Sequence, residues 1–192
     1  MPDDQQSELT REFGWWDMFV SPEEDPRSQD PVTGERATLT EYLTNYRLTL
    51  ELKCQGLDAD GMARRSCPPS NLSLLGLVRH LADAELSWFR RVLAGQDAPR
   101  HYRTADDTDA AFNGALPDPA VVAEAWETWR AEVAFAREFV DAAPDLDVTG
   151  RIPDRDQEIS LREVLVHMID EYARHCGHAD LLRERIDGRV GQ

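Results

Sequence analysis

The chain has 192 residues, a length that suits one domain with a single hydrophobic core. Its 37 acidic residues outnumber its 21 lysines and arginines, giving a formal charge of -16 that disfavours nucleic acid and anionic membranes as partners. There is neither an apolar run of roughly 20 residues, as a membrane helix needs, nor a secretory signal at the start. With three scattered cysteines and no disulfide framework, the sequence predicts a cytoplasmic protein.

Residues 1–37 are acidic, rich in proline and glutamine, and lack a long periodic stretch. Within them, the segment 13–20 (FGWWDMFV) is too aromatic for a disordered tail. We expect this irregular N-terminal extension to pack on the domain or on a partner subunit of a homodimer. The domain itself is predicted to occupy residues 38–188.

Two amphipathic helices are predicted in the first half of this domain. The first is predicted to begin at Thr38, because Thr38 and Glu41 match a capping box. The second is predicted over 74–93, with Ser73 as its N-cap and Gly95 as its stop. A polar connection or lid, residues 96–117, follows it.

Two further helices complete the pattern. The third is predicted to begin at Pro119, with Asp118 as its cap, and to end near residue 142. The fourth is predicted from the capping box of Ser160 and Glu163 to about residue 187, after an irregular segment at 144–159. Four long helices with almost no alternating strand pattern indicate an all-α four-helix bundle. The long connections between them require a crossover.

The fourth predicted helix carries an unusual ladder of ionisable residues. His167, Glu171, His175 and His178 fall at i, i+4, i+8 and i+11, which places them on one face. That face also holds apolar residues, so it is expected to be buried, where ionisable groups are costly unless something pairs with them. A divalent cation would do so directly, because ligands one turn apart can reach the same ion.

A third ligand is available on the second predicted helix. His80 shares the apolar stripe of that helix, so His80, Glu171 and His175 form a candidate metal set on two facing helices. Three protein ligands leave a position open for a small molecule, as in catalytic zinc sites, and nickel, iron or manganese would also suit. His167 and His178 are then candidates for orienting the ligands or for proton transfer. A hydrogen-bonded core network without metal is the alternative interpretation.

Other polar residues carry weaker expectations. We interpret Asp83 and Glu85 as surface charges, with the mouth of the pocket as the alternative position for Glu85, and His101 as a solvated residue of the polar connection. Cys176 lies about 100° round the helix from His175, so we expect a packed free thiol rather than a nucleophile. Trp88 is expected in the core.

Two segments resemble the motifs of a known superfamily. Residues 77–85 (LVRHLADAE) resemble the first histidine motif of the DinB-like superfamily, and residues 167–180 (HMIDEYARHCGHAD) resemble its C-terminal ligand helix. More narrowly, the chain is similar to the actinobacterial mini-circle branch, a domain of unknown function related to mycothiol-dependent enzymes. The resemblance covers about residues 38–188.

The resemblance implies a four-helix bundle with a divalent metal held by three side chains, which by position are His80, Glu171 and His175. Glu171 stands where the superfamily usually has a histidine, a change also found in relatives that use mycothiol. The leading hypothesis is therefore a metal-dependent, mycothiol-type S-transferase. The alternatives are a metal-dependent hydrolase using an activated water, and a non-catalytic helical dimer module with a structural metal.

Overall fold

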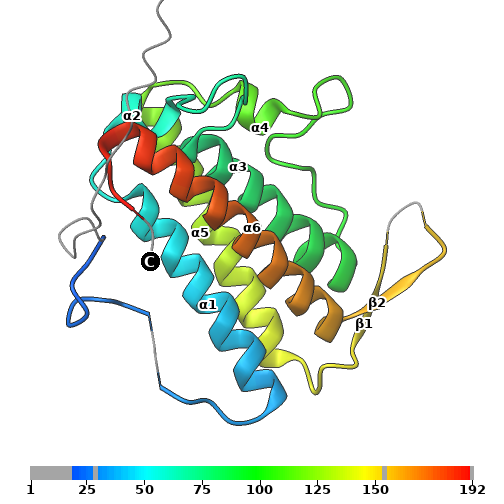
Figure 1. Cartoon of the computed structure of the whole chain (residues 1–192). Helices are drawn as coiled ribbons and strands as arrows, with labels where there is room; N and C mark the ends of the chain where they lie inside the picture. The colour runs from blue at the N-terminus through cyan, green and yellow to red at the C-terminus, as the bar shows by residue number, and fades with distance from the viewer. Residues whose placement is uncertain (1–18, 28–29, 153–154, 191–192) are drawn as a thin grey trace, which may run out of the picture.

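Four long helices lie along a common axis in the computed structural model, which describes residues 19–27, 30–152 and 155–190 (Figure 1). They are α1 (Glu35–Cys54), α3 (Leu74–Glu85) with its continuation η2 (Leu86–Leu93), α5 (Pro119–Ala142) and α6 (Leu161–Asp187). Because α1 packs mainly on α6, and α3 mainly on α5, consecutive helices α1 and α3 are not each other's principal partners. The connection between them, which contains α2 (Ala59–Ala63), therefore crosses the bundle. The all-α bundle with a crossover is confirmed.

Side-chain caps set three of the helix starts at the predicted residues. The Ser73 hydroxyl accepts a hydrogen bond from the first turn of α3, and the Asp118 carboxylate does the same for α5. At α6, Ser160 and Glu163 form both hydrogen bonds of a capping box. Each cap satisfies backbone donors that have no partner inside the helix, so the chain enters each helix at a defined residue.

The predicted start of the first helix is wrong. α1 begins at Glu35 after Gly34, and the Thr38 hydroxyl donates to the Gly34 carbonyl oxygen from inside the helix, at 2.9 Å. Residues 35–37 favour a helix, and Glu35 lies in the first turn, where a negative charge interacts favourably with the helix dipole. The helix therefore gains one turn before the predicted cap.

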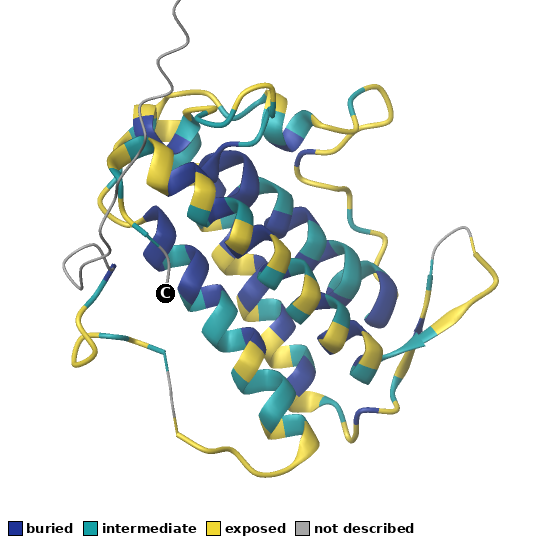
Figure 2. Ribbon diagram, in the orientation of Figure 1, coloured by how far each residue is buried: buried dark blue, intermediate teal, exposed yellow. Residues whose placement is uncertain are grey.

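The buried faces of the four helices meet in one core, as the dark ribbon faces of Figure 2 show. A polar group lies inside this core. Arg47 of α1 donates to both carboxylate oxygens of Glu85 on α3, at 2.8 and 2.7 Å. The Tyr172 hydroxyl of α6 donates to Glu85 at 2.8 Å, and it accepts a hydrogen bond from the Trp129 indole of α5 at 2.8 Å. We call these four residues the closed network. Glu85 is 0% exposed. The prediction of a surface charge there was wrong, because Arg47 supplies the opposite charge from a distant part of the sequence.

The second half of the predicted helix 74–93 is a π-helix, η2, in which the Ala94 amide bonds to the Phe89 carbonyl five residues earlier at 2.9 Å. A short hairpin of β1 (Thr149–Arg151) and β2 (Glu158–Ser160) packs on its end. Gly150 makes this approach possible, because a Cβ there would lie 2.6 Å from the Cα of Leu93. Strands of three residues are too short to give an alternating pattern, so the sequence indicated an irregular segment.

Part of the N-terminal extension packs on the bundle. Phe19 is buried, with the Lys53 ammonium 4.9 Å and the Arg183 guanidinium 5.3 Å from its ring centroid. Residues 13–18 lie outside the described residues, so the packing of the aromatic segment as a whole stays a prediction. In the described part of the chain, none of the helices combines the length and apolar character needed to span a bilayer.

Candidate metal centre

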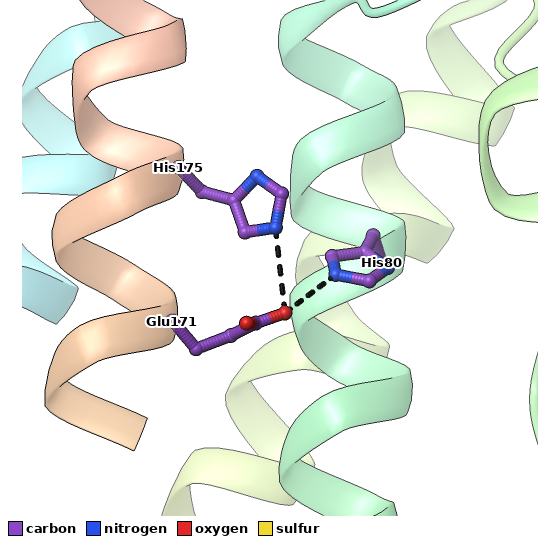
Figure 3. A group of neighbouring side chains, drawn as sticks. All are labelled: His80, Glu171 and His175. Atoms are coloured by element: carbon purple, nitrogen blue, oxygen red, sulfur yellow. Dashed lines mark hydrogen bonds and ion pairs between the residues drawn. The ribbon is translucent and has the colours of Figure 1, made fainter. Parts of the chain in front are cut away.

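Three polar side chains converge between α3 and α6 (Figure 3). The Glu171 Oε1 atom lies 2.9 Å from His80 Nε2 and 3.4 Å from His175 Nε2. The candidate ligand atoms of the three residues all lie within 4.8 Å of one another. We call this group the open cluster. The structure thus brings together the three residues that the sequence singled out as metal ligands.

Local packing explains why the open cluster forms. Glu171 and His175 are one turn apart on α6, so they share a face. His80 is held by Phe112 of α4 (Ala110–Asn113), whose ring stacks on the imidazole with centroids 5.6 Å apart. Phe112 can approach α3 because Gly76 has no side chain; a Cβ there would lie 2.5 Å from the Phe112 ring. Phe112 was missed from the sequence because α4 is only four residues long and lies in the polar connection.

The electrostatics of the open cluster keep its carboxylate charged. Hydrogen bonds from His175 and His80 lower the pKa of Glu171 well below its usual range, although burial acts in the opposite direction. The side chains of His80, Glu171 and His175 are 34%, 20% and 11% exposed. Two imidazoles and one ionised carboxylate are a common ligand set for zinc and related divalent metals, so these residues fit such an ion.

The two accessory histidines have different surroundings. His178 Nδ1 lies 3.3 Å from His175 Nδ1, and burial, followed by the charge of His175, lowers the pKa of His178. Since two ring nitrogens at this distance need one donor and one acceptor, His178 can fix the orientation of His175. His167 packs edge-on against Trp88, with centroids 4.6 Å apart, and the contacts of the described residues do not join it to the open cluster.

A cavity of about 480 Å³ opens beside the cluster. His80 and Glu171 contribute to one part of its wall, and the connection after η2 contributes Arg100, Arg103 and Phe112. This size suits a small-molecule ligand. Trp88 was expected in the core; it is half-buried, packs against the core and also lines this cavity.

Asp83 anchors the connection that forms the cavity wall. Its carboxylate accepts backbone hydrogen bonds from His101, Tyr102 and Arg103 at 2.8, 3.3 and 2.9 Å. The prediction of a surface charge at Asp83 was wrong, because these three donors compensate its burial. His101 is not simply solvated either, since its Nε2 lies 3.1 Å from a carboxylate oxygen of the buried Glu132.

The two buried cysteines, Cys54 and Cys176, are poor candidates for a nucleophile. Cys176 is buried, as predicted, and burial raises the pKa of its thiol to about 12. Burial likewise raises the pKa of Cys54 to about 12. Thiols with such pKa values are almost fully protonated at neutral pH and are poor nucleophiles. Neither residue lines the cavity beside the open cluster.

A second cavity, of about 440 Å³, lies between α1 and α6. Two ion pairs occur in its lining, Asp25 with Arg27 and Lys53 with Asp180. Its charged side chains therefore already have opposite charges beside them, in contrast to the convergence of ligand atoms at the first cavity. The open cluster is the better candidate for chemistry.

The four-helix bundle, with candidate ligand residues on two neighbouring helices next to a cavity, is consistent with the DinB-like class. Residues 38–188 match the family model described as Mycothiol-S-transferase, so the chain belongs to the mycothiol S-transferase family within this class. A search of curated proteins finds no match. The family match confirms the resemblance identified from the two histidine motifs, and the family implies a small-molecule substrate.

Proposed function

We propose that the protein is a metal-dependent S-transferase that joins the sulfur of mycothiol to a small electrophile. The observation that carries the proposal is the convergence of His80, Glu171 and His175, the first two of which line a cavity large enough for a small molecule. Family membership supports mycothiol as the thiol. The high pKa of the buried Cys54 and Cys176 thiols also favours a thiol that comes from a co-substrate.

In this proposal His80 and His175 provide Nε2 atoms and Glu171 provides a carboxylate to hold zinc, nickel or a similar cation. When bound, the cation lowers the pKa of a thiol and favours its thiolate. His178 would fix the ring of His175 through Nδ1, which leaves Nε2 directed to the site. We assign this accessory role to His178 rather than His167, since His167 contacts Trp88 instead.

The reaction is a substitution or an addition at an electrophilic carbon. The sulfur forms a new C–S bond, the leaving group departs with its bonding electrons, and the thiol proton passes to solvent. In an addition, the proton instead ends on the neighbouring carbon. The cavity residues bind and orient the electrophile, which raises the effective concentration of the two reactants.

Two alternatives from the sequence remain to be separated from this proposal by experiment. A hydrolase would use the same three ligands, but the family favours thiol transfer. A structural metal in a dimer module would normally have four protein ligands. The candidate group found among the described residues has three members, which favours a metal with one coordination position left for a small molecule. The homodimer stays a prediction, to be measured by light scattering.

Metal analysis of protein purified without a histidine tag tests the centre directly. We expect about one equivalent of divalent metal, lost in His80→Ala and in His175→Ala but kept in the matched variant His101→Ala. Glu171→His should keep the metal, because histidine can ligate from the same position, whereas Glu171→Leu should lose it. Equal metal content in all these variants would remove the three residues from the proposed ligand set.

Activity is tested with mycothiol and the neutral electrophile 1-chloro-2,4-dinitrobenzene. Conjugate formation should stop when a chelator removes the metal, return when zinc or nickel is added back, and be absent in His80→Ala. Unchanged conjugation by chelator-treated protein would contradict the metal-dependent mechanism. Release of hydrolysed product without consumption of mycothiol would favour the hydrolase instead.

A further inference from the structure

We propose that the cavity beside the open cluster selects electrophiles that carry a carboxylate, and that Arg100 and Arg103 bind this carboxylate. The inference rests on the proposed function, because it names the substrate class of the same cavity. Both arginines line that cavity together with His80 and Glu171. A substrate spanning it would therefore contact the arginines while lying beside the candidate metal centre.

The two guanidinium groups lack an opposite charge of their own. Arg100 donates to the Ser87 hydroxyl at 2.6 Å, and within the described residues neither Arg100 nor Arg103 forms an ion pair. Arg79 and Arg90 are paired with Glu124 and Glu132, whereas Arg91, like Arg100 and Arg103, forms no ion pair among the described residues. What distinguishes Arg100 and Arg103 is that both line the cavity beside the open cluster.

Three acidic residues, Asp83, Asp109 and Glu171, line the same cavity, and among the described residues none of them forms an ion pair with Arg100 or Arg103. The Asp83 carboxylate accepts three backbone hydrogen bonds, and Glu171 belongs to the open cluster. Burial and the positive charges of Arg91 and Arg103 lower the pKa of Arg100, against the opposing effect of Asp83. An anion bound between the two guanidinium groups would relieve their repulsion.

Both arginines are exposed, but the Arg100 guanidinium and the Arg103 backbone are held in place before a ligand binds. The Asp83 carboxylate fixes the backbone of residues 101–103 against α3, and Ser87 of η2 fixes the Arg100 guanidinium. Because part of the ordering cost is met in the free protein, a carboxylate can bind the Arg100 guanidinium with less loss of entropy. Arginine is well suited to this task, since its planar group can bind both oxygens of a carboxylate.

The preferred substrates are therefore small unsaturated or aromatic acids with an electrophilic carbon. A suitable test pair is 4-chloro-3,5-dinitrobenzoate and the uncharged 4-chloro-3,5-dinitrobenzamide. In either compound the mycothiol sulfur forms the C–S bond, the C–Cl bond breaks, chloride leaves with the electron pair, and the thiol proton goes to solvent. The two compounds differ in the charge that Arg100 and Arg103 would recognise, and each enzymatic rate is divided by the uncatalysed rate with thiol because the carboxamide also activates the ring more strongly.

Binding is measured first, without thiol, using the unreactive analogues 3,5-dinitrobenzoate and 3,5-dinitrobenzamide in calorimetric titrations of the full-length, metal-loaded protein. We expect Arg100→Gln and Arg103→Gln each to weaken benzoate binding about fivefold, and the double variant about twentyfold, as for partly exposed charge pairs. Arg185→Gln, which makes the same charge change at an exposed position of α6, should have no effect on benzoate binding. The benzoate affinity should also fall as salt is added.

Kinetics with mycothiol then separate this inference from the proposed function. We expect kcat/KM to favour the chlorobenzoate over the chlorobenzamide, and the ratio to fall in the double arginine variant. If neither compound is conjugated but the arginine variants still lose benzoate binding, the transferase fails and the carboxylate site stands. If both compounds are conjugated equally, or if benzoate binding is the same in the double variant and in Arg185→Gln, the carboxylate site is overturned.

Discussion

The closed network and the open cluster join the same two helices with opposite results. Glu85 of α3 and Tyr172 of α6 belong to the closed network, while His80 of α3 and Glu171 of α6 belong to the open cluster. In the closed network every member is at most 4% exposed, and the charge of Arg47 is matched by Glu85. In the open cluster the side chains are 11–34% exposed and two imidazoles share one carboxylate.

This comparison separates two uses of buried polar groups. A network whose donors and acceptors are all paired inside the protein has nothing left to bind, so its role is to hold the helices in one arrangement. A cluster whose members face a cavity keeps ligand atoms available for an ion or a substrate. Adjacent positions on one helix, Glu171 and Tyr172, thus belong to the open cluster and to the closed network respectively.

The largest effect should come from breaking the closed network. Glu85→Gln leaves the Arg47 guanidinium buried without its opposite charge, and we expect the free energy of unfolding to fall by about 3–5 kcal/mol. Urea denaturation measures this loss, with Glu127→Gln on the exposed face of α5 as the matched control. A loss below about 1 kcal/mol would show that water reaches Arg47 and that the network is not closed.

A smaller effect is expected at Asp83, which resembles the closed network in being fully partnered but lies at the cavity. Asp83→Asn replaces one acceptor oxygen by a donor group facing backbone N–H groups, which should cost about 1–3 kcal/mol. Hydrogen exchange at the amides of residues 101–103 should accelerate. Asp97→Asn, an exposed change in the same connection, should leave both measurements unaltered.

The open cluster should be far less important for stability. In metal-free protein we expect His80→Ala to change the free energy of unfolding by less than about 1 kcal/mol, because the imidazole is partly exposed and its carboxylate partner can be hydrated. Added zinc or nickel should raise the melting temperature of the unaltered protein and not that of the variant. A loss of several kcal/mol in metal-free His80→Ala would instead make the cluster a structural network.

The smallest effect concerns pH. Because the pKa of Glu171 is lowered in the folded state, its contribution to stability is present above the unfolded value of about 4.3 and is lost as pH falls below it. Between pH 6 and pH 3.5, chelator-treated protein should therefore lose slightly more stability than Glu171→Gln, by less than about 1 kcal/mol after allowance for solvent. Equal losses in the two proteins would show that the histidines do not stabilise the carboxylate.

Much of the fold could be predicted because it depends on local signals. Helical spacing and the caps at Ser73, Asp118 and Ser160 placed three helix starts, and these signals act within one or two turns. The meeting of His80 with Glu171, 91 residues later, was predicted from the apolar faces of two helices and from the resemblance to the two superfamily motifs.

The remaining features depend on partners that are distant along the chain. Glu85 is 38 residues from Arg47, and Asp83 is 18 residues or more from the backbone amides whose hydrogen bonds it accepts. The sequence around each carboxylate is compatible with a solvent-facing helix, and only tertiary packing supplies the compensating group. The position of Phe112 against His80 has the same cause, since it follows from the absence of a side chain at Gly76.

The π-helical form of η2 has a consequence for how this chain can change over evolution. A π-helical turn holds one residue more than an α-helical turn for the same rotation, so it can accommodate an extra residue without turning the segments on either side. Removing one residue from 86–93 would therefore allow ordinary hydrogen bonding between residues four apart and would put at risk only contacts made within this stretch, such as those of Arg90 with Glu132 and Arg91 with the Ala98 carbonyl. Single-residue deletions should therefore be tolerated better in 86–93 than in the α-helical part of the same helix, 74–85.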